Sequence, residues 1–151
     1  MQILIDDLSS PAVAAFLEAH LQDMRSVSPP ESRHALDIDG LRHPSVSFWC
    51  MRDAGEVIGC GALQLIAAGH AEIKSMRVAT DRRRQGIGAA LLRHLLDEAR
   101  RRQLSRVSLE TGSMPFFESA RRLYAGFGFA PCPPFGEYRD DPNSVFMTLS
   151  L

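Results

Sequence analysis

Three consecutive arginines stand directly before a Gly-x-Gly sequence in the segment DRRRQGIGAALLRHLL. Gly86 and Gly88 precede leucines that recur at helical spacing, so both glycines are expected at the start of a helix. The first amides of a helix have no partner within it, and the helix dipole places partial positive charge there. Such a terminus binds phosphate well, and neighbouring guanidinium groups add charge-assisted donors. The segment therefore has the chemistry of a polyphosphate cradle.

Neither of two common phosphate-binding loops matches this segment. A Walker A loop requires G-x-x-x-x-G-K-[ST], which the chain lacks, and a dinucleotide fingerprint requires a third glycine where Leu91 stands. The remaining pattern is Arg83-x-x-Gly86-x-Gly88. Taken alone, this loop is explained equally well by an anion cradle and by a solvated arginine face before a tight turn.

The bulk properties indicate one domain over residues 1–151 and exclude several classes of protein. The formal net charge of −1 argues against a general nucleic-acid binder, so any anion site must be local. We expect neither a signal peptide nor a membrane span, because no apolar run is long enough. The three cysteines form no C-x-x-C pair, which argues against a metal site and favours a cytoplasmic location.

Hydrophobic patterning places the cradle within an alternation of strands and helices. Helices are expected from Pro11 to before Pro29, across residues 32–41, from about Gly86 to Arg102, and within residues 115–129. Strands are expected at 2–5, 46–53, 57–66, 71–78, 106–111 and 144–151.

The short turns between the second, third and fourth strands require these strands to be antiparallel neighbours. The helix that follows the fourth strand then forms a crossover, which sets the fifth strand parallel to the fourth. We therefore expect an α/β fold with a mixed, mostly antiparallel sheet of six or seven strands and helices on both faces.

The loop pattern and a second segment together resemble the GNAT superfamily of acyl-CoA-dependent N-acyltransferases. The family pattern [QR]-x-x-G-x-[GA] lies where its fourth strand meets its third helix, as the arginine loop does here. The segment ARRLYAGFGF is similar to the family's A-x-x-L-Y-x-x-x-G-F near the chain end. The resemblance runs from Val46 to the end, and it implies a sheet that splays between strands four and five.

The resemblance implies acetyl-CoA as the acyl donor, with the pantetheine arm lying along the fourth strand. Met76 and Val78 are then the backbone contacts, and the Met76 amide polarises the thioester carbonyl. The pyrophosphate contacts are expected from Arg83, Arg84, Gln85, Gly86, Ile87, Gly88 and Ala89.

Acyl transfer to an amine also needs an acid for the departing thiolate and a base for the protonated amine. Tyr124 matches the family tyrosine beside the thioester sulfur, and a phenol is protonated at neutral pH. Glu72 is the first candidate base and Glu110 the second, and each would need a raised pKa. Glu72 is alternatively a surface carboxylate or the partner of Lys74, and some family members use no dedicated base.

The acceptor site is expected between the proline-rich segments at 28–44 and 132–146. His34, Glu110 and Tyr138 are its candidate contacts, but the mixed charges of these segments do not identify the amine. One departure from the family is Phe117, which stands where many members carry an asparagine seven residues before the tyrosine; Thr111, Ser113 or Ser119 are candidate substitutes.

Two further functions remain open at this point. A non-catalytic acyl-CoA sensor would keep the cradle without the chemistry, although Tyr124 argues against it. A nucleic-acid module built on the arginine clusters is disfavoured by the balanced charge and the lack of an aromatic platform. A small-molecule or peptide amine is therefore the expected partner, and a homodimer is considered because dimers are common in the family.

Overall fold

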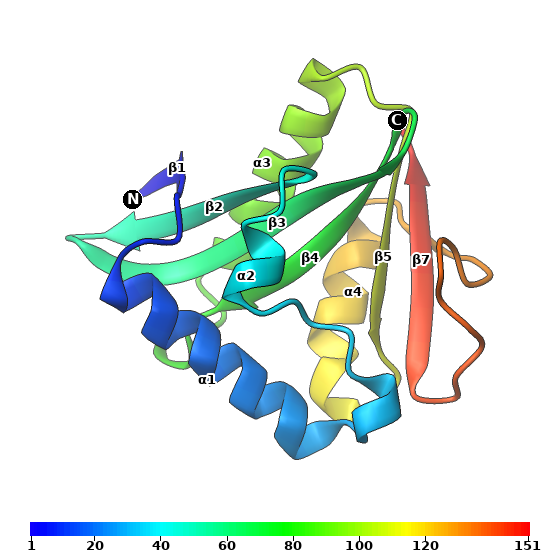
Figure 1. Ribbon diagram of the computed structural model, residues 1–151, viewed down its shortest axis with the longest axis horizontal. Coiled ribbons are helices and arrows are strands. Elements are labelled where there is room, and N and C mark those ends of the chain that lie inside the picture. The colour runs from blue at the N-terminus through cyan, green and yellow to red at the C-terminus, as the bar shows by residue number, and fades with distance from the viewer.

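The computed structural model describes all 151 residues as one seven-stranded sheet flanked by four α-helices (Figure 1). The sheet order is β1-β2-β3-β4-β5-β7-β6, and every neighbouring pair is antiparallel except β4 and β5. This confirms the expected mixed, mostly antiparallel sheet. The strands are β1 (Gln2–Ile5), β2 (Val46–Asp53), β3 (Glu56–Ala67), β4 (His70–Val78), β5 (Arg106–Gly112), β6 (Ala130–Pro131) and β7 (Ser144–Ser150).

The helices cover both faces of the sheet, as the sequence predicts (Figure 1). They are α1 (Pro11–Val27), α2 (Ile38–Leu41), α3 (Ile87–Arg101) and α4 (Glu118–Gly126), with short 3-10 turns η1 (Pro30–Ser32), η2 (Thr80–Arg82) and η3 (Pro115–Phe117). Strand alternation divides the core. Phe48 and Cys50 pack with α1 and α2, whereas Trp49 packs with the buried leucines of α3.

Two expectations about the secondary structure need correction. The helix expected across residues 32–41 is wrong for most of its length, because α2 begins only at Ile38, where the Asp37 side chain accepts a hydrogen bond from the Gly40 amide. The Arg33 side chain donates back to the carbonyl oxygens of Ser28 and Arg25, which holds the connection to α1 as a loop. The two-residue strand β6 is absent from the expectations, because no periodicity exists over so short a run.

The parallel strands β4 and β5 separate soon after they meet. They pair only from His70 to Glu72 against Arg106 to Ser108, although both strands continue beyond these residues. A register shift between β3 and β4 accompanies the separation, and Ser75 there has a φ of 54°. The main chain of β4 from Ile73 onward therefore has no β-ladder partner on its β5 side. This confirms the predicted splay between strands four and five.

Helix α3 connects β4 to β5 and packs closely against β3. Its apolar stripe is fully buried, and Leu91 and Leu95 lie directly over the glycines of β3. A Cβ added at Gly59 would lie 2.7 Å from Leu91 Cδ1, and one at Gly61 would lie 3.1 Å from Leu95 Cδ1. The absent side chains of β3 thus let the helix approach the sheet, which sets the position of its N-terminus.

We expect Gly59→Ala to destabilise the fold by about 1–3 kcal/mol, because the added methyl group overlaps Leu91 in a packed core. Urea unfolding of the purified chain measures the change. Gly126→Ala is the control, since nothing lies within 4 Å of an added Cβ at the end of α4. Equal midpoints for wild type and Gly59→Ala would contradict the packing described above.

Candidate active site

The N-terminus of α3 presents unpaired backbone amides at an open turn. Gly86 is the N-cap with a φ of 78°, a left-handed conformation that glycine adopts without steric cost. Ala90 donates to the Gly86 carbonyl at 3.0 Å, so the amides of Ile87, Gly88 and Ala89 precede the first hydrogen bond of the helix. Nothing lies within 4 Å of a Cβ built on Gly86, and the turn is therefore open to a ligand.

The three arginines before this turn have different environments. The Arg82 guanidinium donates to Asp53 at 3.0 Å and lies 3.5 Å from Glu56, so it ties the loop to the β2–β3 hairpin. Neither Arg83 nor Arg84 forms an ion pair, and both guanidinium groups are free to meet an anion. Arg83 also lies over the ring of Phe116, 5.9 Å from its centroid.

A cavity of about 620 Å³, here called the inner cavity, extends from this turn into the gap between β4 and β5. Its floor is the unpaired stretch of β4, where Ser75 is buried and its hydroxyl has no hydrogen-bond partner. The walls come from the ends of α1 and β5 and from one side of α4. Backbone donors at one end and unpaired main chain along the floor fit a ligand with phosphates and a polar, extended arm.

Tyr124 brings a protonated phenol to the floor of the inner cavity. The ring packs edge-on against Phe129, and the hydroxyl lies 4.0 Å from the Met76 sulfur on β4. Burial, aided by the negative charge of Glu110, raises the pKa of Tyr124 to about 12. The structure thus brings two predicted site residues, Tyr124 and Met76, side by side, and keeps the phenol protonated at neutral pH.

Glu110 lies on β5, on the opposite side of the gap from β4, and also lines the inner cavity. Burial raises the pKa of its carboxyl group to about 7. Glu110 therefore exchanges a proton near neutral pH, which is the range that a general base needs.

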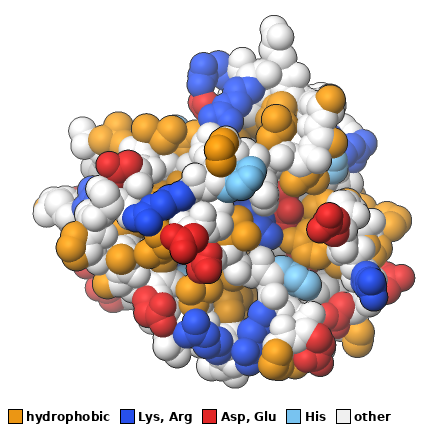
Figure 2. Space-filling view, viewed as in Figure 1, with side chains coloured by type: hydrophobic (Ala, Val, Ile, Leu, Met, Phe, Trp, Pro, Cys, Tyr) orange, Lys and Arg blue, Asp and Glu red, His pale blue; other side chains and the backbone are white.

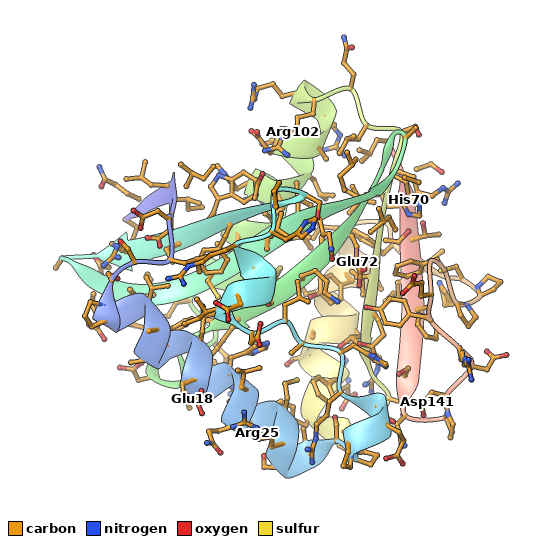
Figure 3. The ribbon with its side chains drawn as sticks, viewed as in Figure 1. Glu18, Arg25, His70, Glu72, Arg102 and Asp141 are labelled. Carbon is orange, nitrogen blue, oxygen red and sulfur yellow. The ribbon has the colours of Figure 1, made fainter.

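Glu72 is held in a buried network and does not stand free in the cavity. The Tyr138 hydroxyl donates to Glu72 Oε2 at 2.5 Å, and Lys74 Nζ donates to the same oxygen at 3.3 Å. Lys74 also donates to the Tyr138 hydroxyl and to the His34 carbonyl oxygen, each at 3.0 Å. Both charged side chains are at least 90% buried. Figure 3 shows Glu72 on β4 in the middle of the sheet face.

His34, Glu72, Lys74 and Tyr138, here called the dividing wall, separate the inner cavity from a second one. The second cavity, called the outer cavity, measures about 1000 Å³, and all four residues line both cavities. The His34 ring packs edge-on against Tyr138 with 4.9 Å between centroids. Burial and the nearby Lys74 charge lower the pKa of His34, so its imidazole is neutral at pH 7.

Phe117, which stands where many members of the family carry an asparagine, packs against the end of β5. A Cβ at Gly112 would lie 2.1 Å from the Phe117 ring, so the glycine provides the space for that ring. Ser113 is already engaged, since its hydroxyl donates to the Pro142 carbonyl at 2.7 Å. Thr111 and Ser119 line the inner cavity and are the remaining candidates for a polar contact to the arm.

Two residues of the site stand outside the predicted set. Ser75 was missed because a register shift in a strand leaves no mark in the hydrophobic pattern. The sequence analysis considered Lys74 only as an alternative ion-pair partner of Glu72, although their two-residue spacing already placed both side chains on one face of a strand.

The structure contains neither a group of side chains suited to a metal ion nor a helix suited to span a membrane. No group of three or more His, Cys, Asp or Glu side chains is arranged to hold a metal ion. None of the helices combines the length and hydrophobicity needed to span a bilayer. Figure 2 shows basic and acidic side chains interspersed over the visible face, without an extended field of one sign.

Comparisons with known proteins agree with this geometry. The family model described as the acetyltransferase (GNAT) family matches residues 13–129. The chain is 48% identical to the uncharacterised N-acetyltransferase YsnE of Bacillus subtilis over all of both chains. It is 46% identical to the uncharacterised N-acetyltransferase YedL of Escherichia coli, over 99% of this chain and 94% of the relative.

The fold is also that of an aminoglycoside 6'-N-acetyltransferase solved with coenzyme A, with a TM-score of 0.69 and 17% identity over 99% of this chain and 97% of that one. At this identity the likeness concerns the fold alone. The family model and the two relatives, together with the splayed sheet and the open turn at α3, show that the chain belongs to the acetyltransferase (GNAT) family and is an N-acetyltransferase with acetyl-CoA as its acyl donor.

Proposed function

We propose that the inner cavity holds acetyl-CoA with its diphosphate at the N-terminus of α3 and its pantetheine arm along β4. The amides from Gln85 to Ala89 and the guanidinium groups of Arg83 and Arg84 are the proposed phosphate donors. The main chain of Met76 and Val78 contacts the arm, because β4 has no ladder partner there. The single observation that carries the proposal is the combination of an open cradle at one end of the inner cavity and an unpaired strand edge along its floor.

The double substitution Arg83→Ala/Arg84→Ala is expected to weaken coenzyme A binding at least tenfold, because each charge-assisted contact contributes about 1.5–3 kcal/mol. Calorimetric titration with coenzyme A at low ionic strength measures the affinity. Arg100→Ala/Arg101→Ala is the matched control, since it removes two arginines from the opposite end of α3. Equal losses in the two variants would mean that only net charge matters, and the proposed cradle would be wrong.

We propose Tyr124 as the acid that protonates the departing sulfur and the Met76 amide as the donor that polarises the carbonyl. Acetyl-CoA supplies the acetyl thioester, and the chain supplies the proton and the orientation. Transfer from Tyr124 is supported by its protonated state, its burial and its 4.0 Å distance from the Met76 side chain on the cavity floor. An acid that stands within reach of the leaving group typically contributes about 10²–10⁴-fold to the rate.

Tyr124→Phe is therefore expected to lower kcat by about 10²-fold or more while leaving the affinity for coenzyme A within about threefold. The rate is followed as free thiol released from acetyl-CoA in the presence of a panel of amines and peptides. The variant keeps the ring that packs on Phe129, so its melting temperature serves as the control for folding. Undiminished turnover would remove Tyr124 from the chemistry.

For the base we propose Glu110 instead of Glu72. The Glu72 carboxylate already accepts hydrogen bonds from Tyr138 and Lys74, so it is engaged in the dividing wall and does not stand free to meet an amine. Glu110 lines the inner cavity and has a pKa of about 7, so it can take a proton from an ammonium group at neutral pH. Glu72 then orients Tyr138 and Lys74 in the dividing wall.

The pH dependence of turnover tests this assignment. Because a base acts in its deprotonated form, kcat for wild type should rise through pH 7 and level off above it. Glu110→Gln should lose this rise and run at least tenfold slower at pH 8. Retention of the rise in Glu110→Gln, together with its loss in Glu72→Gln, would restore Glu72 as the base.

The acceptor is a small-molecule or peptide amine, and we propose that it contacts His34 and Tyr138 of the dividing wall and Glu110 in the inner cavity. The placement is supported because all three side chains line the inner cavity, where we also place the acyl donor. Three further statements stay predictions from the sequence. They are that residues 1–151 act as one domain, that the chain forms a homodimer, and that it works in the cytoplasm. Light scattering of the purified protein tests the dimer.

A further inference from the structure

Two polar groups of β4 that line the inner cavity are buried without partners. The Ser75 hydroxyl and the Arg77 Nε–H group form no hydrogen bond, although Ser75 is only 9% exposed and the Arg77 side chain only 10%. Nearly all buried polar groups in folded proteins have a partner. A ligand in the inner cavity can supply the missing acceptor, and the chemistry proposed above uses neither side chain.

Helix α1 holds Arg77 in place. Its Nη1 donates to Asp23 at 2.5 Å, and its guanidinium carbon lies 5.4 Å from the centre of the Phe16 ring. These contacts leave the side edge of the guanidinium, which carries Nε, without an acceptor. Through such an edge arginine binds a carboxylate with two parallel hydrogen bonds.

Two residues of α1, His20 and Met24, also line the inner cavity, and with Ser75 and Arg77 they are here called the α1 pocket. Burial and the nearby Arg77 charge lower the pKa of His20 to about 4, so its imidazole is neutral at pH 7. A neutral imidazole still donates through one ring nitrogen. The α1 pocket therefore offers hydroxyl, imidazole and guanidinium donors, and none of its four side chains is acidic.

The acceptor side of the inner cavity also has a cation without an acidic partner. Arg33 lines this side, and its guanidinium donates only to main-chain carbonyl oxygens. The other two cations there, Lys74 and Arg77, each have one carboxylate partner. A ligand group with a single negative charge therefore fits. A dianionic phosphate would bring its second charge against the carboxylates that already pair with these cations.

We propose that the α1 pocket binds the carboxylate of the acceptor, which makes the substrate a small amino acid with a free amine. Arg77 and Ser75 hold the carboxylate, and the amine extends into the gap beside β4 toward Glu110. Both ends of the acceptor lie in the inner cavity, so it crosses no wall of the protein. This inference rests on the proposed function, because it takes the acyl donor to occupy the same cavity.

The carboxylate is unchanged in the reaction. The acceptor nitrogen forms a bond to the acetyl carbon, and the carbon–sulfur bond breaks. Of the two protons that the ammonium loses, one ends on the sulfur of coenzyme A and the other is released through the base.

Amino acids compared with their own carboxamides test the inference. Glycine, 3-aminopropanoate and 4-aminobutanoate are each paired with the matching carboxamide, and kcat/KM is measured from thiol release. The series varies the spacing between amine and carboxylate, so it also measures the reach from the α1 pocket to the acetyl group. We expect the best-fitting acid to exceed its carboxamide about tenfold, mainly through a lower KM.

Two substitutions should change this ratio in opposite directions. Arg77→Lys keeps the positive charge but lacks the Nε edge, so the ratio should fall about fivefold. Asp23→Asn removes the carboxylate that competes for the guanidinium, so the ratio should rise about threefold. If the two residues only tied α1 to β4, both changes would lower the melting temperature and leave the ratio unaltered.

Ser75→Ala tests the pocket without touching this ion pair, and it should lower the ratio about threefold because only an unpartnered hydroxyl is removed. It therefore decides the matter even if Arg77→Lys does not fold. Arg52→Lys is the matched control, since Arg52 pairs with Asp6 and does not line the inner cavity. This control should keep the tenfold ratio.

Equal use of acids and carboxamides, or coenzyme A binding without turnover of any amino acid, would overturn the inference and leave the proposed donor site intact. A loss of coenzyme A affinity in Arg77→Lys as large as that in Arg83→Ala/Arg84→Ala would assign Arg77 to the donor end and would also overturn it. Failure of the wild-type chain to bind coenzyme A would instead contradict the proposed function.

Discussion

The separation of β4 from β5 after Glu72 is the constraint on which the rest of the structure depends. Two parallel strands normally continue their ladder, because buried backbone groups without partners are costly. Here the irregular pairing at Ser75 turns β4 away from β5, and the unpaired stretch of β4 becomes the floor of the inner cavity. A bound arm that pairs with the free edge would recover those hydrogen bonds, so the cost of the gap in the free protein becomes binding free energy.

Burial in the gap between β4 and β5 raises the pKa of both residues that we propose for proton transfer. The same loss of water raises the pKa of Tyr124 to about 12 and that of Glu110 to about 7, although one group serves as an acid and the other as a base. Each carboxylate beside the gap has its own environment. Glu72 has a lysine and a phenol as partners, whereas burial dominates at Glu110. Environment therefore distinguishes two glutamates that the sequence alone ranks in the opposite order.

The sequence predicted the parts of the fold that depend on local patterns. The capped start of α1, the long strands and the glycine turn at α3 follow from residues within one element. The splay followed from the family resemblance. The contacts that complete the site join distant segments, such as Ser32 with Asp141 and Tyr138 with Glu72, and no local signal reports them. Helix α2 was overestimated for a different reason, because the Arg33 side chain donates to nearby backbone carbonyls of Ser28 and Arg25, and such a side-chain contact leaves no mark in the hydrophobic periodicity.

The two halves of the site also differ in how much they depend on side chains. The proposed cradle uses main-chain amides at Gly86 and beyond, which many sequences can provide as long as the turn and the helix start are kept. The proposed acceptor side is made largely of side chains on two loops, which meet where Tyr138 packs against His34 and where Asp141 and Asn143 bond to Ser32. Substitutions in those loops would change the charge and width of the outer cavity while leaving the donor end unaltered. The donor end of the site therefore depends on a backbone conformation, whereas the acceptor end depends on the identity of individual side chains.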